Sequence, residues 1–133
     1  MNKFEEIRKE VEMYLMERFK YRQPFVYLTI SNVVATRQRV KIDLYLRICR
    51  IKGLFPHDCL IIARIGFREE RIGHGTHFVH FLTKIAVKYG FKHIGIESTN
   101  EKSKEFAEKL GFHSIDGSNY VATTDSLIEY FQN

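Results

Sequence analysis

The sequence has 133 residues, of which 44% are hydrophobic and 28% charged, and its formal net charge is +5. This length suits a single domain over residues 1–133, and the composition argues against intrinsic disorder. The longest apolar run, Cys59 to Ala63, is far too short for a membrane helix, and the charged N-terminus is unlike a secretory signal. Two cysteines indicate no disulfide framework. We therefore expect a cytoplasmic protein that does not associate with membranes.

The first half of the sequence predicts one helix followed by three strands. Apolar residues recur at three- and four-residue steps from Phe4 to Phe19, which is typical of a helix over residues 3–20 with one buried face. Residues 25–36 are rich in Val, Ile, Thr and Tyr, which favours a strand. Residues 39–51 alternate between apolar and mostly polar side chains, as a half-buried strand does, and 60–67 give the third strand.

The second half predicts a helix, a strand, a second helix, two short strands and a final helical turn. Glycines mark the ends of both helices, where a left-handed residue commonly stops a helix. The first helix is expected after Gly75 and ends at Gly90, and the second starts after Asn100 and stops at Gly111. The strands are expected over 93–97, 112–115 and 120–124, and the final helical turn over 125–131. This order predicts an α/β (α+β) fold with a mixed, mostly antiparallel central sheet flanked by helices.

A basic stretch lies between Thr36 and Lys52, with one acid, Asp43. Its basic residues are Arg37, Arg39, Lys41, Arg47, Arg50 and Lys52. The plainer interpretation is a solvated strand face. A nucleic-acid surface would need interleaved aromatic side chains for base stacking, and Tyr45 is the one aromatic expected on that face. Nucleic acid is therefore not expected as a partner.

The segment from Glu70 to Thr76 joins a predicted strand to a helix and contains Gly73 and Gly75. Two such glycines at a helix start let backbone amides converge on a ligand, and the helix dipole adds positive potential, so the site suits a phosphate. A dinucleotide motif would need a third glycine at Phe78, and the Gly-Lys-Ser/Thr ending of a Walker loop is missing. The glycine pair alone fits an ordinary turn equally well.

The segment from Asn100 to Phe112, which ends in Lys-Leu-Gly-Phe, resembles the second signature block of the GCN5-related N-acetyltransferase (GNAT) superfamily. In that family the block follows an Arg/Gln-x-x-Gly-x-Gly/Ala loop at the spacing found here between Gly75 and Asn100. The resemblance spans about residues 59–115. It implies a GNAT-like fold and an acetyl-CoA-dependent N-acyltransferase, which moves an acetyl group to a primary amine by direct attack on the thioester.

The resemblance also implies a site for acetyl-CoA. A strand would bind pantetheine and polarise the thioester carbonyl, the loop amides would hold the pyrophosphate, and two polar side chains would contact the pantetheine arm and the adenosine phosphates. The strand residues are Ile65, Gly66 and Phe67, and the loop residues are Arg71, Ile72, Gly73, His74, Gly75 and Thr76. Asn100 would contact the pantetheine arm, and Lys102, with Lys104 as the alternative, would contact the adenosine phosphates. Amides fixed near a developing oxyanion would stabilise the tetrahedral intermediate.

Two positions depart from the family's pattern. Glu70 stands where the family has Arg or Gln, and Ala107 stands where many members have a tyrosine that protonates the leaving thiolate. A thiol with a pKa of about 8.5 leaves unprotonated at pH 7 at a cost of roughly 2 kcal/mol, which slows the reaction without abolishing it. Tyr120 and Ser103 are the candidate replacement acids.

Glu97, at the end of its predicted strand, is the candidate general base. A lysine acceptor needs a base, because deprotonating it at pH 7 costs about 5 kcal/mol, whereas an α-amine costs about 1 kcal/mol. The alternative for Glu97 is a solvent-facing acid without a catalytic role. His57 and Asp58 are weaker candidates, since they precede a different strand.

No metal is expected, because His74, His77 and His80 have no carboxylate or cysteine at ligand spacing. The alternative function is a catalytically degenerate GNAT domain that acts as a CoA-binding or regulatory module, since a fold alone does not secure a function. Ala107 and Glu70 favour this alternative. The sequence does not identify the amine acceptor and leaves a homodimer open.

Overall fold

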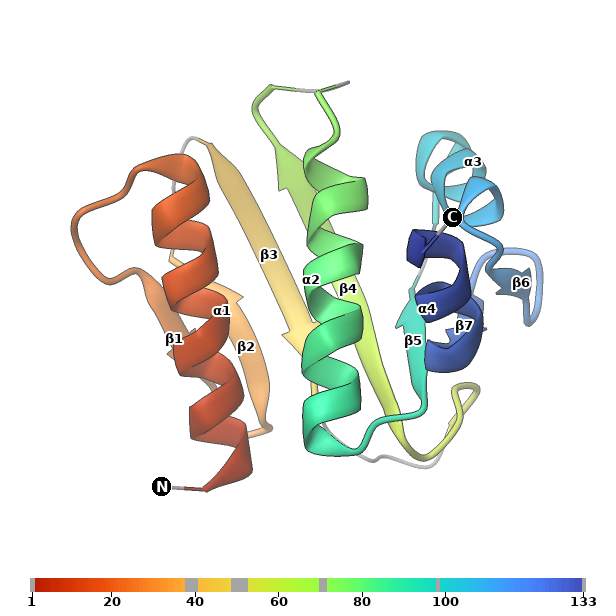
Figure 1. Ribbon diagram of the computed structural model, residues 1–133, viewed down its shortest axis with the longest axis horizontal. Helices are drawn as coiled ribbons and strands as arrows, with labels where there is room; N and C mark the ends of the chain where they lie inside the picture. The colour runs from red at the N-terminus through yellow and green to blue at the C-terminus, as the bar shows by residue number, and fades with distance from the viewer. Residues whose placement is uncertain (1, 38–40, 49–52, 70–71, 98, 133) are drawn as a thin grey trace.

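A computed structural model describes residues 2–37, 41–48, 53–69, 72–97 and 99–132. Within these ranges the chain forms four helices and a seven-stranded sheet (Figure 1). The elements are α1 (Lys3–Phe19), β1 (Val26–Leu28), β2 (Val33–Thr36), β3 (Ile42–Arg47), β4 (Cys59–Phe67), α2 (His74–Tyr89), β5 (His93–Ile96), α3 (Glu101–Lys109), β6 (His113–Ser114), β7 (Tyr120–Thr123) and α4 (Thr124–Gln132). The predicted strand over 39–51 lies partly outside the described residues.

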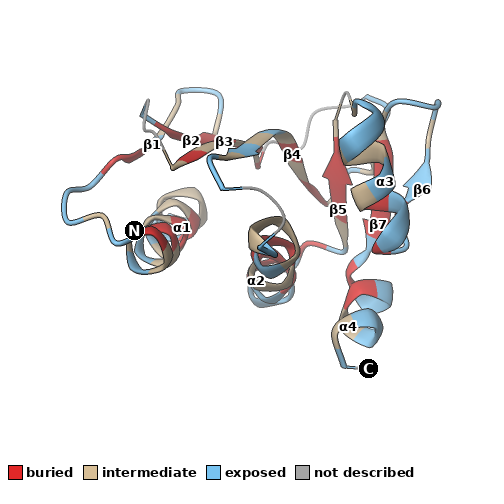
Figure 2. Cartoon of the chain, turned by 90° about the horizontal axis from the view of Figure 1, so that it is seen from above, coloured by how far each residue is buried: buried red, intermediate tan, exposed pale blue. Residues whose placement is uncertain are grey.

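The sheet has the strand order β1-β2-β3-β4-β5-β7-β6. Every neighbouring pair is antiparallel except β4 and β5, which run parallel and are connected through α2. Helices α1, α2 and α4 lie on one side of the sheet (Figure 2). The mixed, mostly antiparallel sheet predicted from the sequence is therefore confirmed.

Helix α1 forms as its apolar spacing predicts. The Asn2 side chain caps its start by accepting a hydrogen bond from the Glu5 amide, and Lys20 ends it in the left-handed conformation with φ of 62°. Its buried side chains are Ile7, Val11, Leu15 and Phe19. Burying an aliphatic side chain of this size contributes about 1.5–3 kcal/mol, so this face fixes the helix on the sheet.

The prediction of one strand over residues 25–36 is wrong, because the segment is a hairpin of two strands. The Thr29 hydroxyl accepts hydrogen bonds from the Ser31 and Val33 amides, and Asn32 takes a positive φ of 61°. Asn tolerates this left-handed conformation, so the chain reverses within four residues. The turn was not predicted, because the residues on both sides of it have high β-propensity.

Strand β4 contains a β-bulge at Ala63. Arg64 pairs with Tyr45 of β3, but the next paired residue of β4 is Ile62, opposite Leu46. Side chains alternate between the faces of a strand, so one extra residue reverses the alternation. Beyond the bulge, Ile65 therefore stays on the face that carries α1 and α2, and Arg64 points to the opposite face.

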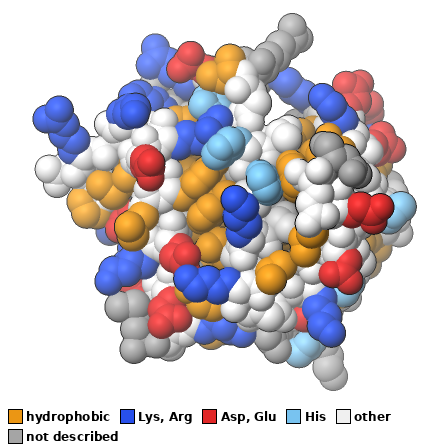
Figure 3. Space-filling model, in the orientation of Figure 1, with side chains coloured by type: hydrophobic (Ala, Val, Ile, Leu, Met, Phe, Trp, Pro, Cys, Tyr) orange, Lys and Arg blue, Asp and Glu red, His pale blue; other side chains and the backbone are white. Residues whose placement is uncertain are grey.

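Two histidines of α2 pack in opposite directions, towards α1 and towards α4. His77 hydrogen-bonds through Nδ1 to the Tyr14 hydroxyl at 2.6 Å, and the His80 ring stacks on Phe131 with the ring centroids 4.4 Å apart. Partial burial lowers the pKa of both histidines, and nearby cations, among them Arg18 for His77, lower it further. Charged side chains of both signs intermingle on this helix face (Figure 3).

We expect the free energy of unfolding to fall as the pH is lowered from about 7.5 to 5.5. The pKa values of His77 and His80 are lower in the folded chain than the 6.5 of an unfolded histidine, so the unfolded chain binds more protons in this window. Guanidinium denaturation at several pH values measures the slope, and His77→Gln with His80→Gln should make it shallower. A double variant with the wild-type slope would show that other groups cause it.

Candidate active site

Strands β4 and β5 separate part-way along their length. Their parallel pairing runs from Cys59 and His93 to Ile62 and Ile96, and the Glu97 amide then donates to the Ile62 carbonyl at 3.0 Å. Strand β4 continues beyond this point, paired with β3, and the two strands diverge towards the start of α2 (Figure 1). The backbone of β4 thus loses its β5 partner over the segment that the family resemblance implies for the thioester.

A cavity of about 180 Å³ occupies this opening. It is lined by Ile62, Ala63, Arg64, Ile65, Ile96, Glu97, Asn100 and Ser103. The structure thereby brings together the strand predicted to bind pantetheine, the candidate base and the start of the second signature block. The sequence had placed these groups on separate elements without showing that they meet.

The end of β4 is linked to the start of α2 by aromatic packing. The Phe67 ring lies 5.9 Å from the Phe19 ring and 5.2 Å from the His74 ring, measured between centroids. Gly66 pairs with Asp43 of β3. The strand residues predicted to bind pantetheine therefore lead directly to the predicted phosphate loop.

The start of α2 presents backbone amides without a side-chain cap. Gly73 is the N-cap residue with a left-handed φ of 81°, and no side chain hydrogen-bonds to the amides from this position. Amides of the first helical turn, here His74 to Thr76, have no carbonyl partner within their own helix, and the helix dipole favours an anion there. Ile72 beside them is 55% exposed. Glu70 and Arg71 lie outside the described residues.

Gly75 has a packing role that the sequence did not indicate. A Cβ atom at this position would lie 3.1 Å from the Phe106 ring of α3. Glycine therefore lets α3 approach the start of α2. Since Gly75→Val would push against Phe106 first, that substitution is a poor test of phosphate binding.

His74, the first residue of α2, is a neutral hydrogen-bond donor. The Arg18 Nε atom donates to its Nδ1 atom at 3.0 Å, which leaves the proton of a neutral ring on Nε2. Partial burial lowers the pKa of His74, the charge of Arg18 adds to this effect, and Glu69 opposes it. Sequence reasoning missed Arg18, because nothing in the pattern of α1 connects it with a loop 56 residues away.

Asn100, which is predicted to hydrogen-bond the pantetheine arm, caps α3 with its side chain. Its Oδ1 atom accepts a hydrogen bond from the Ser103 amide at 2.9 Å, while the Ser103 hydroxyl accepts one from the Asn100 amide at 2.9 Å. This capping box fixes the start of α3 beside the cavity. Lys102 and Lys104 lie in the first turn of the same helix.

Glu97 forms an ion pair across β4 with Arg47. The Arg47 Nε and Nη2 atoms lie 3.0 and 3.4 Å from the two carboxylate oxygens. On the same face Arg64 pairs with Asp43, with 2.7 Å between Nε and Oδ2, and both guanidinium groups lie over the Tyr45 ring, 5.5 and 5.3 Å from its centroid. Sequence reasoning treated Arg47 as part of a solvated face, although the alternation already put it beside Tyr45.

The candidate acids lie in different surroundings. Tyr120 is 3% exposed and stands opposite Ile96 in the sheet, among core side chains. Ser103 lines the cavity but takes part in the cap of α3. Ala107 is fully buried, so a tyrosine there would overpack the core rather than fill an open position.

His57 and Asp58 precede β4 at the end remote from the opening. Asp58 pairs with His93 Nδ1 at 2.8 Å, and this hydrogen bond lowers the pKa of Asp58. Cys59 beside them is buried, and burial raises the pKa of its thiol to about 12. These residues are therefore kept apart from the cavity between β4 and β5.

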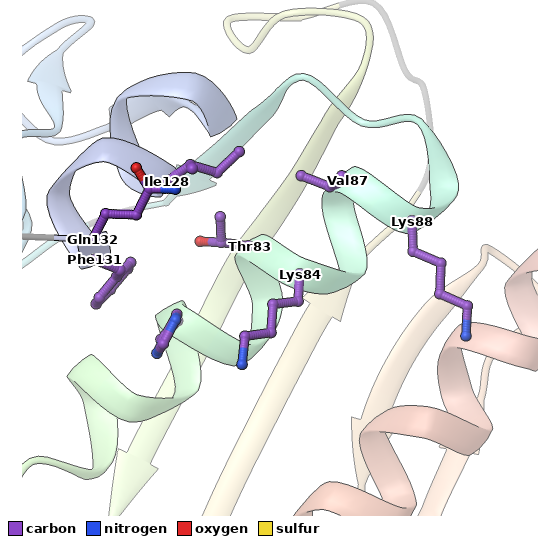
Figure 4. A pocket seen from close by; sticks show the side chains of 8 residues that line it. Thr83, Lys84, Val87, Lys88, Ile128, Phe131 and Gln132 are labelled. Atoms are coloured by element: carbon purple, nitrogen blue, oxygen red, sulfur yellow. The ribbon is translucent and has the colours of Figure 1, made fainter.

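A second, larger groove of about 420 Å³ lies between α2 and α4 (Figure 4). Its lining residues are His80, Thr83, Lys84, Val87, Lys88, Ile128, Phe131 and Gln132. This groove contains none of the site residues predicted from the sequence. Among the described residues we find no cluster of three or more His, Cys, Asp or Glu that could hold a metal ion, and no helix long and apolar enough to cross a membrane.

No family model and no curated protein matches the chain. Among solved structures, a chain of the KacTA–DNA complex superposes with a TM-score of 0.56 at 18% identity, over 93% of this chain and 85% of that one. A mutant AtaT toxin bound to the C-terminus of the antitoxin AtaR gives 0.55 at 17% identity, over 76% and 70% of the two chains. The same toxin mutant with acetyl-CoA gives 0.54 at 17% identity, over 76% and 71%. The chain thus shares the fold of these structures, which agrees with the GNAT-like fold that its second signature block implied.

Proposed function

We propose that the protein is an acetyl-CoA-dependent N-acyltransferase that acetylates a primary amine. The observation that carries the proposal is the cavity between β4 and β5, which is lined by Ile65, Glu97 and Asn100. The uncapped start of α2 follows β4 in the chain. The crystallisation of the structurally similar AtaT with acetyl-CoA supports the choice of acyl donor. In this proposal the described chain works as one GNAT-like domain over residues 1–133 in the cytoplasm.

The described residues fit acetyl-CoA. The amides at the start of α2 and the His74 ring offer donors to a pyrophosphate, and the β4 backbone from Ala63 to Phe67, which has no β5 partner, can pair with the amides of pantetheine. An amide of this segment would donate to the thioester oxygen as negative charge develops there. Lys102, or Lys104 as the alternative, would contact the adenosine phosphates.

The two proton transfers are assigned to opposite faces of the sheet. The amine nitrogen attacks the thioester carbon, the carbon–sulfur bond breaks, and the ammonium proton passes to Glu97, which lies on the face of Arg47. The leaving thiolate takes a proton from Tyr120, which lies beside Ile96 on the face of the core, or from water. If water is the proton source, the thiolate leaves unprotonated, which costs about 2 kcal/mol at pH 7.

A degenerate CoA-binding or regulatory module is the second candidate function. It is favoured by the burial of Tyr120, which is 3% exposed, and by the absence of a tyrosine at Ala107. The antitoxin is the partner of the AtaT toxin, and the DNA belongs to the KacTA complex. For this chain the lack of a nucleic-acid partner stays a prediction, and a homodimer stays open.

We expect Ile72→Asp to weaken acetyl-CoA binding about tenfold at low salt, which corresponds to about 1.4 kcal/mol. The new carboxylate would stand next to the amides that hold the pyrophosphate, and its repulsion would shrink as salt is added. Leu54→Asp is the matched control, because Leu54 is 61% exposed and precedes the opposite end of β4. Isothermal calorimetry measures both, and equal losses in the two variants would contradict the phosphate-loop assignment.

We expect Glu97→Gln to lower kcat by about 10²–10⁴-fold at pH 7 with a lysine-type acceptor, because a general base contributes a factor of this size. The loss should shrink as the pH rises towards the pKa of the amine. Glu101→Gln, an exposed substitution with the same charge change in the first turn of α3, serves as the control. A thiol-release assay gives the rates, and wild-type rates at every pH would leave Glu97 as a surface acid.

A further inference from the structure

The cavity between β4 and β5 has a charged rim on the sheet face opposite α1 and α2. Arg64 and Glu97 both line the cavity, one from β4 and the other from the end of β5. The bulge at Ala63 is what turns Arg64 to this face. An amine that approaches the thioester from here therefore meets one carboxylate and one guanidinium.

The two ion pairs of this rim differ in their exposure to solvent. In the pair of Arg47 with Glu97 the side chains are 36% and 27% exposed, whereas in the pair of Arg64 with Asp43 they are 60% and 47% exposed. An exposed surface ion pair contributes only about 0–1 kcal/mol. Arg64 can therefore exchange Asp43 for a ligand anion at little cost, while Arg47 keeps Glu97 in place.

Tyr45 supports this division of roles. Its ring contacts both guanidinium groups, so it restrains Arg64 near the cavity even when Asp43 is released. The register places Tyr27, Ala35, Tyr45 and Arg64 in one row across four strands. Arg37 lies over the Tyr27 ring at 5.2 Å, which adds a further positive charge to the same face.

We propose that the acceptor is a small amine that also carries an anionic group, a carboxylate or a phosphate, with Arg64 binding the anion and Glu97 receiving the ammonium. This inference rests on the proposed acetyl transfer. An amine without an anionic group would interact with Glu97 alone. An anionic amine satisfies both sides of the rim, and a guanidinium binds carboxylates and phosphates through two parallel hydrogen bonds.

Two matched pairs of amines test the proposal. They are phosphoethanolamine against ethanolamine, and β-alanine against propylamine, each assayed by thiol release from acetyl-CoA. We expect kcat/KM to be at least tenfold higher for the anionic member of one pair or both. The pair with the larger preference tells whether a phosphate or a carboxylate is recognised.

Variants then assign the preference to Arg64. We expect Arg64→Gln to bring the ratio of kcat/KM for the anionic amine to kcat/KM for its partner without the anionic group close to one, through a higher KM for the anionic amine. Arg64→Lys should keep part of this ratio. Lys92→Gln removes the same charge at the other end of β5 and should keep the full ratio.

Three results would overturn the proposal. They are equal kcat/KM values within both pairs for the wild type, a preference that survives Arg64→Gln, and an equal loss of preference in Lys92→Gln. Failure of the proposed acetyl transfer gives different results from these three. In that case acetyl-CoA does not bind in calorimetry, or it binds but no thiol is released with any of the four amines, and the acceptor proposal is then wrong as well.

Discussion

The arrangement of the site depends on where the backbone hydrogen bonds of β4 end. On one side β4 stays paired with β3 as far as Phe67, but on the other its pairing with β5 stops at Ile62 and the Glu97 amide. Buried backbone groups need partners, so a strand that continues without a neighbour offers its amides and carbonyls to a ligand. Because of the bulge at Ala63, Ile65 faces the side of α1 and α2 and Arg64 faces the opposite side.

The pair of Arg47 and Glu97 ties this opening to the rest of the sheet. It spans from β3 across β4 to the end of β5, at 3.0 Å between Nε and Oε1. A candidate base held in this way has a fixed position, but it must give up part of its interaction with Arg47 to accept a proton. The acceptor ammonium loses its positive charge in the same step in which Glu97 loses its negative charge. The net charge near Arg47 therefore changes less than it would if Glu97 alone were protonated.

Patterns within single elements were predictable, and contacts between elements were not. The periodicity of α1 and the glycines that end α2 and α3 gave the helices to within a few residues. The turn at Thr29 to Asn32 was not predicted, because residues of high β-propensity lie on both sides of it and the left-handed Asn32 is a single-residue feature. Arg18, which contacts His74, is distant in sequence from its partner, and no periodicity reveals such a pair.

The residues that resemble the family most closely also hold the fold together. Gly75 gives room to Phe106, and Asn100 caps α3 with Ser103. These contacts would be retained by a domain that had lost its catalytic activity, so the signature residues alone do not separate the two candidate functions. The two candidate functions differ at the rim of the cavity. Arg64 faces away from the core, is 60% exposed and contributes little to stability through Asp43, so the proposed acceptor needs this side chain while the fold does not.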